Sequence, residues 1–331
     1  MNRVVPWVAA LTLSIGLAPA CLAAYTATAE VNAQALGQAS VNELAPVVLG
    51  SSDQQRDTRA SGTATASVGV SRHAQVGTAD AGGGASSWAQ VVAGGIQLQA
   101  TGTGNGLFLS PGDAWFARIL GRGTAYAGAS FSDGLTFSVP GLAVGAPLTL
   151  TFGINVTGSI SSMGQFAQGL SGYGTVTDMR WHVSLGNLSD GRSESEYNSN
   201  GLIDRSAVAT GLRSFVATVG NGVPTVLAME ASVGASAQGG VSCRGCGFAA
   251  LYAEGNSYAD FSHTFAWNGI QGALDAAGNP LALADLQVMS SSGFNYLSAW
   301  SAPVPELPSP ALMAAGLLVL AGFVGKRRHP R

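Results

Sequence analysis

The chain carries little charge, and lysine is almost absent from it. Of its 331 residues only 10% are Asp, Glu, Lys or Arg, and the single lysine is Lys326. Between Tyr25 and Val304 there are 17 acidic residues and 10 arginines, so this stretch is mildly acidic. Phosphate binding needs clustered cations, and so does docking on an anionic membrane face. The composition therefore argues against both nucleic acid and an anionic membrane surface as partners.

Residue types that carry catalysis or bind metals are also few. The chain has three cysteines and four histidines, and it contains neither a Gly-x-Ser-x-Gly elbow nor a His-Glu-x-x-His pattern. His263 lies between Phe261 and Phe265 on an apolar stripe, so we interpret it as a core histidine. The spacing of Asp and Glu reveals no carboxylate pair typical of a glycosidase. We therefore predict no catalytic residue, no required cofactor and no enzymatic activity.

Two of the three cysteines, Cys243 and Cys246, form a Cys-Arg-Gly-Cys motif. In an exported protein this spacing favours a disulfide across a short loop. Free thiols are the first alternative. A thioredoxin-type redox site is the second, but it needs a helix N-terminus within a βαβ unit, and the surroundings here are Gly-rich and β-like. No second pair of ligands indicates a zinc site.

An oxygen-rich stretch lies within residues 187–205. Asp190, Glu194 and Glu196 offer the carboxylates that calcium prefers, so a calcium site is one hypothesis. The spacing does not fit an EF-hand loop, and Arg192 intrudes. We favour a long solvated loop, which is also a possible boundary between two subdomains.

The first 24 residues have the features of a secretory signal peptide. Arg3 supplies positive charge, Val4 to Leu17 supplies the apolar region, and small residues follow. Cys21 raises the alternative of a lipoprotein, although Ala18 stands where such signals usually place Leu. We expect the Sec machinery to export the chain.

A second apolar run, Ala311 to Gly325, precedes the C-terminus. As a helix it would span about 22 Å, which is short of the roughly 30 Å hydrocarbon core. A basic cluster follows it and is expected to stay cytoplasmic, with the body on the outer side of the inner membrane. The basic residues are Lys326, Arg327, Arg328 and Arg331. An ordinary single-span anchor is one interpretation.

A more specific interpretation comes from the motif before this run, Val304-Pro305-Glu306-Leu307-Pro308. The order of motif, apolar helix and Arg-rich end resembles the PEP-CTERM sorting signal of Gram-negative bacteria. The resemblance covers residues 304–331, and Leu307 stands where the family usually has proline. It implies that exosortase, a membrane-embedded cysteine transpeptidase, processes the chain. It also implies transient anchoring in the inner membrane through residues 311–325, then sorting to the outer surface or matrix, in association with exopolysaccharide and biofilm.

The body, residues 25–302, is predicted to be all-β. Apolar and polar residues alternate strictly over Leu148 to Thr157, and similar stripes run over Met179 to Leu185, Leu227 to Ala235 and Phe261 to Trp267. A period of two places alternate side chains on opposite faces of a strand. Weaker strand candidates are residues 63–70, 88–92, 95–101, 114–120, 215–219, 248–253 and 286–290. These patterns predict an antiparallel β-sandwich between the signal peptide and the 303–331 sorting segment, and a jelly-roll-like topology is one arrangement that fits them.

Turn chemistry gives three further expectations. Ser132-Asp133-Gly134 separates two apolar runs and predicts a three-residue hairpin loop with Gly134 in the left-handed conformation. Asp275 to Pro280 predicts another turn. Leu36 to Ser61 has little periodicity and is expected to form a loop or an extension.

The sequence leaves three functions open. The first is a non-enzymatic matrix protein, the second a carbohydrate-binding module, and the third a glycan-active enzyme. An exposed row of Trp or Tyr on one sheet would favour carbohydrate binding, and two carboxylates close together in a cleft would favour an enzyme. Trp181 and Trp267 lie on apolar stripes and are expected in the core, whereas Trp88 and Trp115 are free of this constraint.

Overall fold

The computed structural model describes residues 24–42, 45–109, 116–167, 171–205, 210–244 and 250–301. These residues form two antiparallel β-sheets and contain no helix. Sheet A consists of β1 (Thr26–Val41), β2 (Val47–Arg59), β6 (Phe116–Ser138), β9 (Ser171–Leu185), β10 (Leu188–Ser199), β11 (Leu202–Arg205), β13 (Pro224–Arg244) and β16 (Gln287–Ser290). Sheet B consists of β3 (Ala64–Val76), β4 (Ala79–Val92), β5 (Gly95–Leu109), β7 (Pro147–Val156), β8 (Ser159–Phe166), β12 (Gly211–Gly220), β14 (Ala250–Leu274) and β15 (Pro280–Leu281).

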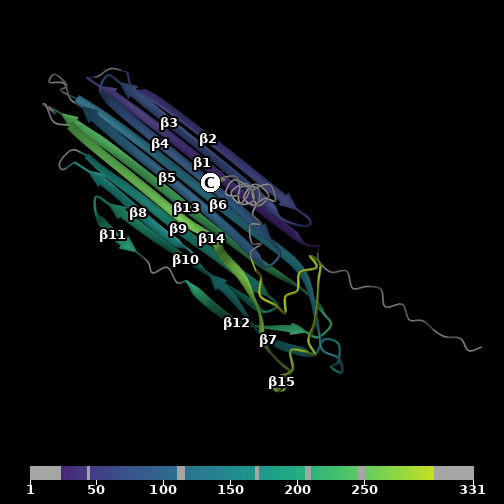
Figure 1. The fold of residues 1–331 in the computed structure, drawn as a ribbon. Helices are drawn as coiled ribbons and strands as arrows, with labels where there is room; N and C mark the ends of the chain where they lie inside the picture. The colour runs from purple at the N-terminus through teal and green to yellow at the C-terminus, as the bar shows by residue number, and fades with distance from the viewer. Residues whose placement is uncertain are drawn as a thin grey trace, which may run out of the picture. The chain divides into compact units, whose positions relative to one another are not determined.

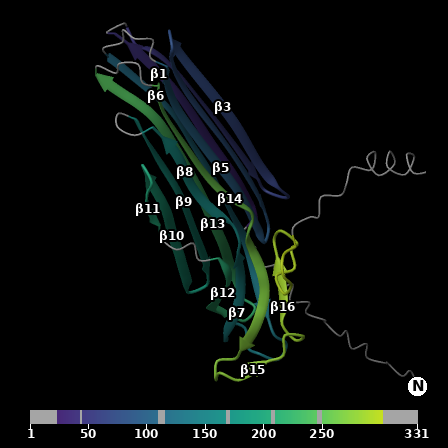
Figure 2. The same cartoon turned by 60° about the vertical axis from the view of Figure 1, so that its left-hand side comes forward.

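The strand order shows how the chain alternates between the sheets. Sheet A runs β11-β10-β9-β13-β6-β1-β2, and sheet B runs β12-β7-β14-β5-β4-β3 (Figure 1). In addition, β16 pairs with β6, and both β8 and β15 pair with β14. Strands β7, β12 and β15 lie at one end of the two sheets (Figures 1 and 2). The predicted all-β class with antiparallel sheets in a sandwich is confirmed, and the jelly-roll topology stays a prediction.

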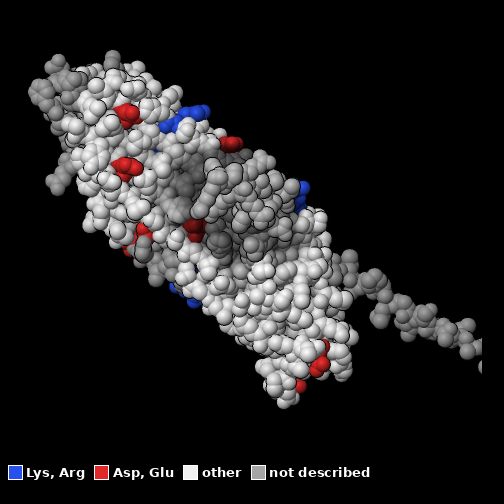
Figure 3. All heavy atoms as spheres, viewed as in Figure 1, with Lys and Arg blue, Asp and Glu red and all other residues white. Residues whose placement is uncertain are grey.

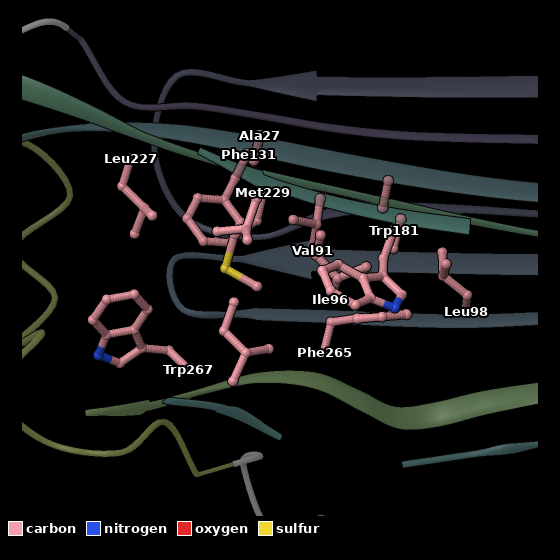
Figure 4. Packing of buried hydrophobic residues seen from close by; sticks show 14 of the residues in the cluster. Ala27, Val91, Ile96, Leu98, Phe131, Trp181, Leu227, Met229, Phe265 and Trp267 are labelled. Carbon is pink, nitrogen blue, oxygen red and sulfur yellow. The ribbon is translucent and has the colours of Figure 1, made fainter. Parts of the chain in front are cut away.

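The four strictly alternating stripes build the main core. Their apolar positions are buried on β7, β9, β13 and β14, with Trp181 8% exposed and Trp267 fully buried. Figure 4 shows Phe131, Trp181 and Met229 from sheet A among side chains of sheet B. Each large apolar side chain that is removed from water contributes about 1.5–3 kcal/mol to the stability of the fold. The aromatic side chains of this core therefore hold the two sheets together.

A band of glycines separates this core from a smaller one around Phe108 and Ile119. We call the band the glycine waist; it comprises Gly82, Gly83, Gly84, Gly102, Gly104, Gly121, Gly123, Gly239 and Gly255. A Cβ on Gly104 would lie 2.5 Å from the carbonyl oxygen of Gly121 in the other sheet, and one on Gly102 would lie 2.8 Å from that of Gly123. Facing sheets usually lie about 10 Å apart with side chains between them. At the waist the two backbones touch instead.

Side chains of sheet A bond backbone amides on two outer strands of sheet B, β3 and β8. Along β3, Asp57 accepts a hydrogen bond from the Thr65 amide at 3.0 Å, and Gln55 accepts one from the Ser67 amide at 2.8 Å. Along β8, the Ser162 amide donates a hydrogen bond to Glu196 at 2.8 Å. Unpaired edge groups invite association with other strands, and these contacts occupy them.

The last described segment, after β15, folds back over the end of the sandwich. Asp133 on β6 is fully buried and accepts hydrogen bonds from the Tyr296 hydroxyl at 2.8 Å and from the amide and hydroxyl of Ser292. The Trp267 indole donates to the Tyr296 carbonyl at 2.8 Å. These bonds fasten residues 286–300 to both sheets, because Asp133 belongs to sheet A and Trp267 to sheet B.

Three expectations about local structure were wrong. Residues 36–61 mostly form the end of β1 and all of β2, and residues 187–205 mostly form β10 and β11. Ser132-Asp133-Gly134 lies inside the continuous strand β6, where it pairs with β13 from Ala228 to Val226. Pairing across a long strand outweighed the local turn signal, because a buried ladder satisfies more backbone groups than a loop. The predicted Asp275–Pro280 turn is confirmed: Asp275 accepts bonds from the amides of Ala277 and Asn279.

The predicted signal peptide and sorting segment lie outside the described residues. The described residues up to Trp300 belong to one compact unit. Within the described part of the chain, no helix has the length and apolar character needed to cross a membrane.

Candidate functional site

A hollow lined by charged and aromatic side chains lies on the outer face of sheet A. It has a volume of about 570 Å³ and lies over β6, β9 and β13, and we call it the Tyr126 trough. Tyr126, Asp178, Glu230 and Ser232 line it, together with Arg180. An adjoining hollow of about 180 Å³ shares Tyr126 and Glu230 and extends across β1 to Glu30 and Arg56.

Strand register explains why these side chains meet. Tyr126 pairs with Asn32 on one side and Gly234 on the other, and Gly234 pairs with Asp178. In the adjacent row, Glu30, Gly128, Ser232 and Arg180 stand opposite one another. Alternation turns all of these residues to the outer face, so they form one continuous surface.

Two glycines make the surface hollow. A Cβ on Gly128 would lie 2.5 Å from the Tyr126 hydroxyl oxygen, so the tyrosine side chain lies across that position. A Cβ on Gly234 would overlap a carboxylate oxygen of Asp178. Any other residue at either position would displace a side chain of the trough, so the shape depends on both glycines.

The electrostatic environment of Tyr126 is acidic. Partial burial raises the pKa of its hydroxyl, a hydrogen bond with Ser232 lowers it, and Glu30, Glu230 and Asp178 raise it further. These three carboxylates come from three different strands. Arg56 lies 3.7 Å from Glu30, with its guanidinium largely exposed at the side of β2.

The trough provides binding groups, and its carboxylates are widely spaced. Tyr126 is 43% exposed and offers an aromatic surface, while Ser232 and the carboxylates offer hydrogen-bonding groups. Glu30 and Glu230 stand two strands apart and two residues out of register, which separates their Cα atoms by about 12 Å. These groups of the trough can hold a polar ligand through stacking and hydrogen bonds.

A second exposed tyrosine shares this face. Tyr197 on β10 is 48% exposed and pairs with the exposed Val176 of β9. It stands three strands from Tyr126, about 14 Å across the sheet. Tyr252, 43% exposed, lies on β14 of sheet B and does not belong to this pair.

The residues of the calcium hypothesis do not meet at one point. Asp190 is exposed and accepts a bond from the amide of Gly191. Glu194 and Glu196 are buried: Glu194 pairs with Arg192 at 2.8 Å, and Glu196 accepts a bond from Ser162 at 2.8 Å. Within the described residues, no group of three or more His, Cys, Asp or Glu side chains is placed to hold a metal ion. The favoured solvated loop was also wrong, because Glu196 and its neighbours seal the edge of β8.

Several other predicted site residues lie at the end of a described segment or outside the described residues. Cys243 is buried, 3% exposed, near the end of β13, and Cys246 lies outside the described residues, so their disulfide stays a prediction. The sorting residues Val304–Pro308 and the basic tail also lie outside them. Trp181 and Trp267 are in the core as predicted, and Trp88 is partly buried on the outer face of sheet B.

Sequence reasoning missed the trough because its parts are far apart in the chain. Tyr126, Asp178 and Glu230 meet only through strand pairing, and none of them lies in a motif. The one local signal was the glycine two residues after Tyr126, a position on the same face that leaves room beside a large side chain.

No family model, no curated protein and no solved structure matches this chain. The interpretation of the trough therefore depends on its geometry.

Proposed function

We propose that this chain is an exported, non-enzymatic protein of the cell surface or extracellular matrix that holds exopolysaccharide on the outer face of sheet A. The single observation that supports this most is the Tyr126 trough, with Tyr197 on the same face. Sugars present apolar C–H faces and many hydroxyl groups, and partly exposed tyrosines beside polar side chains suit both.

The remainder of the surface supports the same proposal. Ser, Thr, Asn and Gln occupy many outward positions, such as Asn32 and Gln34 on β1 and Thr101 and Thr103 on β5. Figure 3 shows few acidic or basic side chains, scattered over the visible face. A broad uncharged polar surface offers many weak hydrogen bonds to hydrated polymers.

The second part of the proposal is that the chain is exported and sorted, with exosortase and the inner membrane as transient partners. The signal peptide features of residues 1–24 and the PEP-CTERM-like segment 303–331 support this part. Mass spectrometry of the mature protein tests it. We expect the C-terminus near Val304–Pro308; a tail intact through Arg331 in cells with active exosortase would contradict processing.

Binding is tested with matched tyrosine variants of the exported protein. Tyr126→Ala and Tyr197→Ala are each expected to weaken binding to the producing cell's exopolysaccharide by about fivefold or more, as stacking residues at ligand sites do. Tyr252→Ala is the control, because it removes an equally exposed tyrosine from sheet B. Co-sedimentation measures retention.

Two outcomes would overturn this assignment. Equal losses in all three variants would show that the effect is unrelated to sheet A. The appearance of new reducing ends in the polymer would instead favour a glycan-active enzyme.

A further inference from the structure

A second hollow lies on the outer face of sheet A, beside the Tyr126 trough. It has a volume of about 610 Å³ and lies over the adjacent strands β2, β1 and β6 (Figure 1). Thr124 lines both hollows, so they adjoin on β6. We call this one the Arg122 hollow. Its lining consists of two neighbouring rows of paired residues, which are Ser52, Gln34 and Thr124 in one row and Gly50, Leu36 and Arg122 in the next.

The position over Gly50 is open. A Cβ on Gly50 would meet only the carbonyl oxygen of Ala35 at 3.8 Å and a methyl carbon of Leu36 at 3.9 Å. Both are ordinary contact distances, so no neighbouring side chain fills the space that the glycine leaves. A ligand therefore finds room on this part of the sheet without displacing a side chain.

Arg122 supplies the charge of the lining, which contains no carboxylate. Its side chain is exposed, and among the described residues it forms neither an ion pair nor a side-chain hydrogen bond. On this face of the sheet the nearest described carboxylate is Asp178, two strands away and four residues out of register. That places the two Cα atoms about 17 Å apart. No described carboxylate thus neutralises Arg122 at contact distance.

The other lining groups suit a sugar ring. Leu36 is partly buried and presents an apolar surface, and hydrogen-bonding side chains surround it. Sugars have apolar C–H faces and many hydroxyl groups, so an apolar side chain among amide and hydroxyl groups fits them. The planar guanidinium of Arg122 donates in a fork that matches the paired oxygens of a carboxylate or of a tetrahedral oxyanion. Together these groups fit a sugar unit that carries an acidic group.

Two further arginines extend the positive surface beyond the hollow. Arg118 lies on the same face of β6, four residues and about 14 Å from Arg122, and Arg244 lies near it on β13. Both are exposed, and neither forms an ion pair within the part of the chain that the structure describes. An acidic polymer that runs along β6 from Tyr126 would meet Arg122 and then Arg118. Several linked contacts of this kind raise the overall affinity for a polymer.

We infer that the Arg122 hollow binds sugar units that carry an acidic group, so that this face of sheet A takes anionic polysaccharides. This inference rests on the proposed function and specifies the class of polymer. The carboxylate of a uronic acid and a sulfate ester share the chemistry that Arg122 recognises. Nucleic acid is less favoured, because its closely spaced phosphates need denser clusters of cations than these arginines provide.

The test compares four polymers, each immobilised on beads, for their retention of the full exported protein. Alginate carries carboxylates, dextran sulfate carries sulfates, dextran is neutral, and single-stranded DNA represents nucleic acid. We expect alginate or dextran sulfate to bind the protein at least about fivefold more tightly than dextran, the effect of one favourable charge contact. The tighter of the two identifies the acidic group, and added salt should reduce the difference from dextran.

Two variants of the hollow test its charge and its shape separately. Arg122→Gln removes the charge, and it should weaken binding of the preferred acidic polymer by about fivefold and leave dextran binding unchanged. Gly50→Leu fills the open position without a change of charge, and it should weaken binding of the acidic polymer by a similar factor. Thermal unfolding confirms that each variant is folded.

Each variant has a matched control in sheet B. Arg213→Gln on β12 changes the net charge by the same amount as Arg122→Gln. Gly69→Leu on β3 adds the same side chain as Gly50→Leu, at a position where a Cβ would meet nothing nearer than 3.8 Å. Both controls should leave binding unchanged. Equal losses in Arg122→Gln and Arg213→Gln would mean non-specific attraction to any arginine, and would overturn the inference.

The remaining outcomes separate this inference from the proposed function. DNA retained as tightly as the acidic polysaccharides, with the same dependence on Arg122, would overturn the assignment to a sugar. Dextran bound as tightly as alginate and dextran sulfate, through Tyr126, would overturn the acidic-sugar inference alone. Failure of the proposed function looks different: the wild-type protein would then be retained neither by the four polymers nor by the cell's own exopolysaccharide.

Discussion

Gly123 on β6 faces the carbonyl oxygen of Gly84 on β4 across the sandwich. A Cβ at this position would overlap that oxygen, and both partners are backbone, so neither can rotate away. The same holds for Gly121 against Gly82. At the waist a single methyl group therefore forces two whole strands apart, whereas in the aromatic core side chains can adjust.

We expect Gly123→Ala to lower the free energy of unfolding by about 3 kcal/mol, the upper range for overpacking a core. Gly69→Ala is the control. Its added Cβ would meet nothing nearer than the Cβ of Ser86 at 3.8 Å, and the expected change is within about 0.5 kcal/mol. Urea denaturation of both variants measures the difference. Similar midpoints would show that the sheets separate at the waist without cost.

Tyr25 and Tyr296 make the fold sensitive to alkali. Burial and, second, the charge of Asp133 raise the pKa of Tyr25 to about 12, although a hydrogen bond with the Ala93 backbone lowers it. Burial and, second, the charge of Asp133 also raise the pKa of Tyr296 well above its usual range. A raised pKa in the folded state favours the neutral hydroxyl. The resulting stability is complete below pH 10 and is lost as the pH rises through the folded-state value.

We therefore expect the protein to lose stability between about pH 10 and pH 12. Tyr25→Phe should bind one proton fewer in the folded state over this range, so its unfolding free energy should fall less steeply with pH. Urea denaturation followed by circular dichroism at several pH values measures this slope. An unchanged slope in Tyr25→Phe would assign the alkaline transition to other groups.

At the scale of the strand, edges are sealed by side chains instead of by further strands. On the β8 side, Glu196 and Asn198 of β10 bond the amide and the carbonyl of Ser162. Both side chains are almost completely buried. The second half of β10, from Glu194 on, thus alternates between buried and exposed positions without an apolar stripe, because its buried polar side chains are satisfied by hydrogen bonds.

The β3 edge offers a direct test of this sealing. The double change Gln55→Ala and Asp57→Ala should speed hydrogen exchange at the amides of Thr65 and Ser67 by about fivefold, since each loses a bond of about 1 kcal/mol. Asp53→Ala is the control, because Asp53 bonds the adjacent amide of Gln54 on its own strand. Unchanged exchange in the double variant would show that water exclusion alone protects this edge.

At the scale of the whole described unit, two cores of different character share one pair of sheets. The aromatic core and the folded-back segment 286–300 hold one end, the Phe108 core holds the other, and the waist joins them. The trough lies over the β6 residues that follow the waist. Its floor therefore lies beside the part of the sandwich where the backbones are most tightly packed.

Alternation in the sequence determined the all-β class and the buried faces of β7, β9, β13 and β14. A period of two in hydrophobicity translates directly into an inside and an outside. The alternation pattern did not predict β2, because this strand is exposed on both faces and has no apolar stripe. It did not predict β10 either, because the buried residues of β10 include Glu194 and Glu196. The tertiary structure alone decided the trough, since Glu30, Tyr126, Asp178 and Glu230 lie on four strands. Hydrophobicity is a property of each residue, whereas a binding surface depends on which strands pair and in which register.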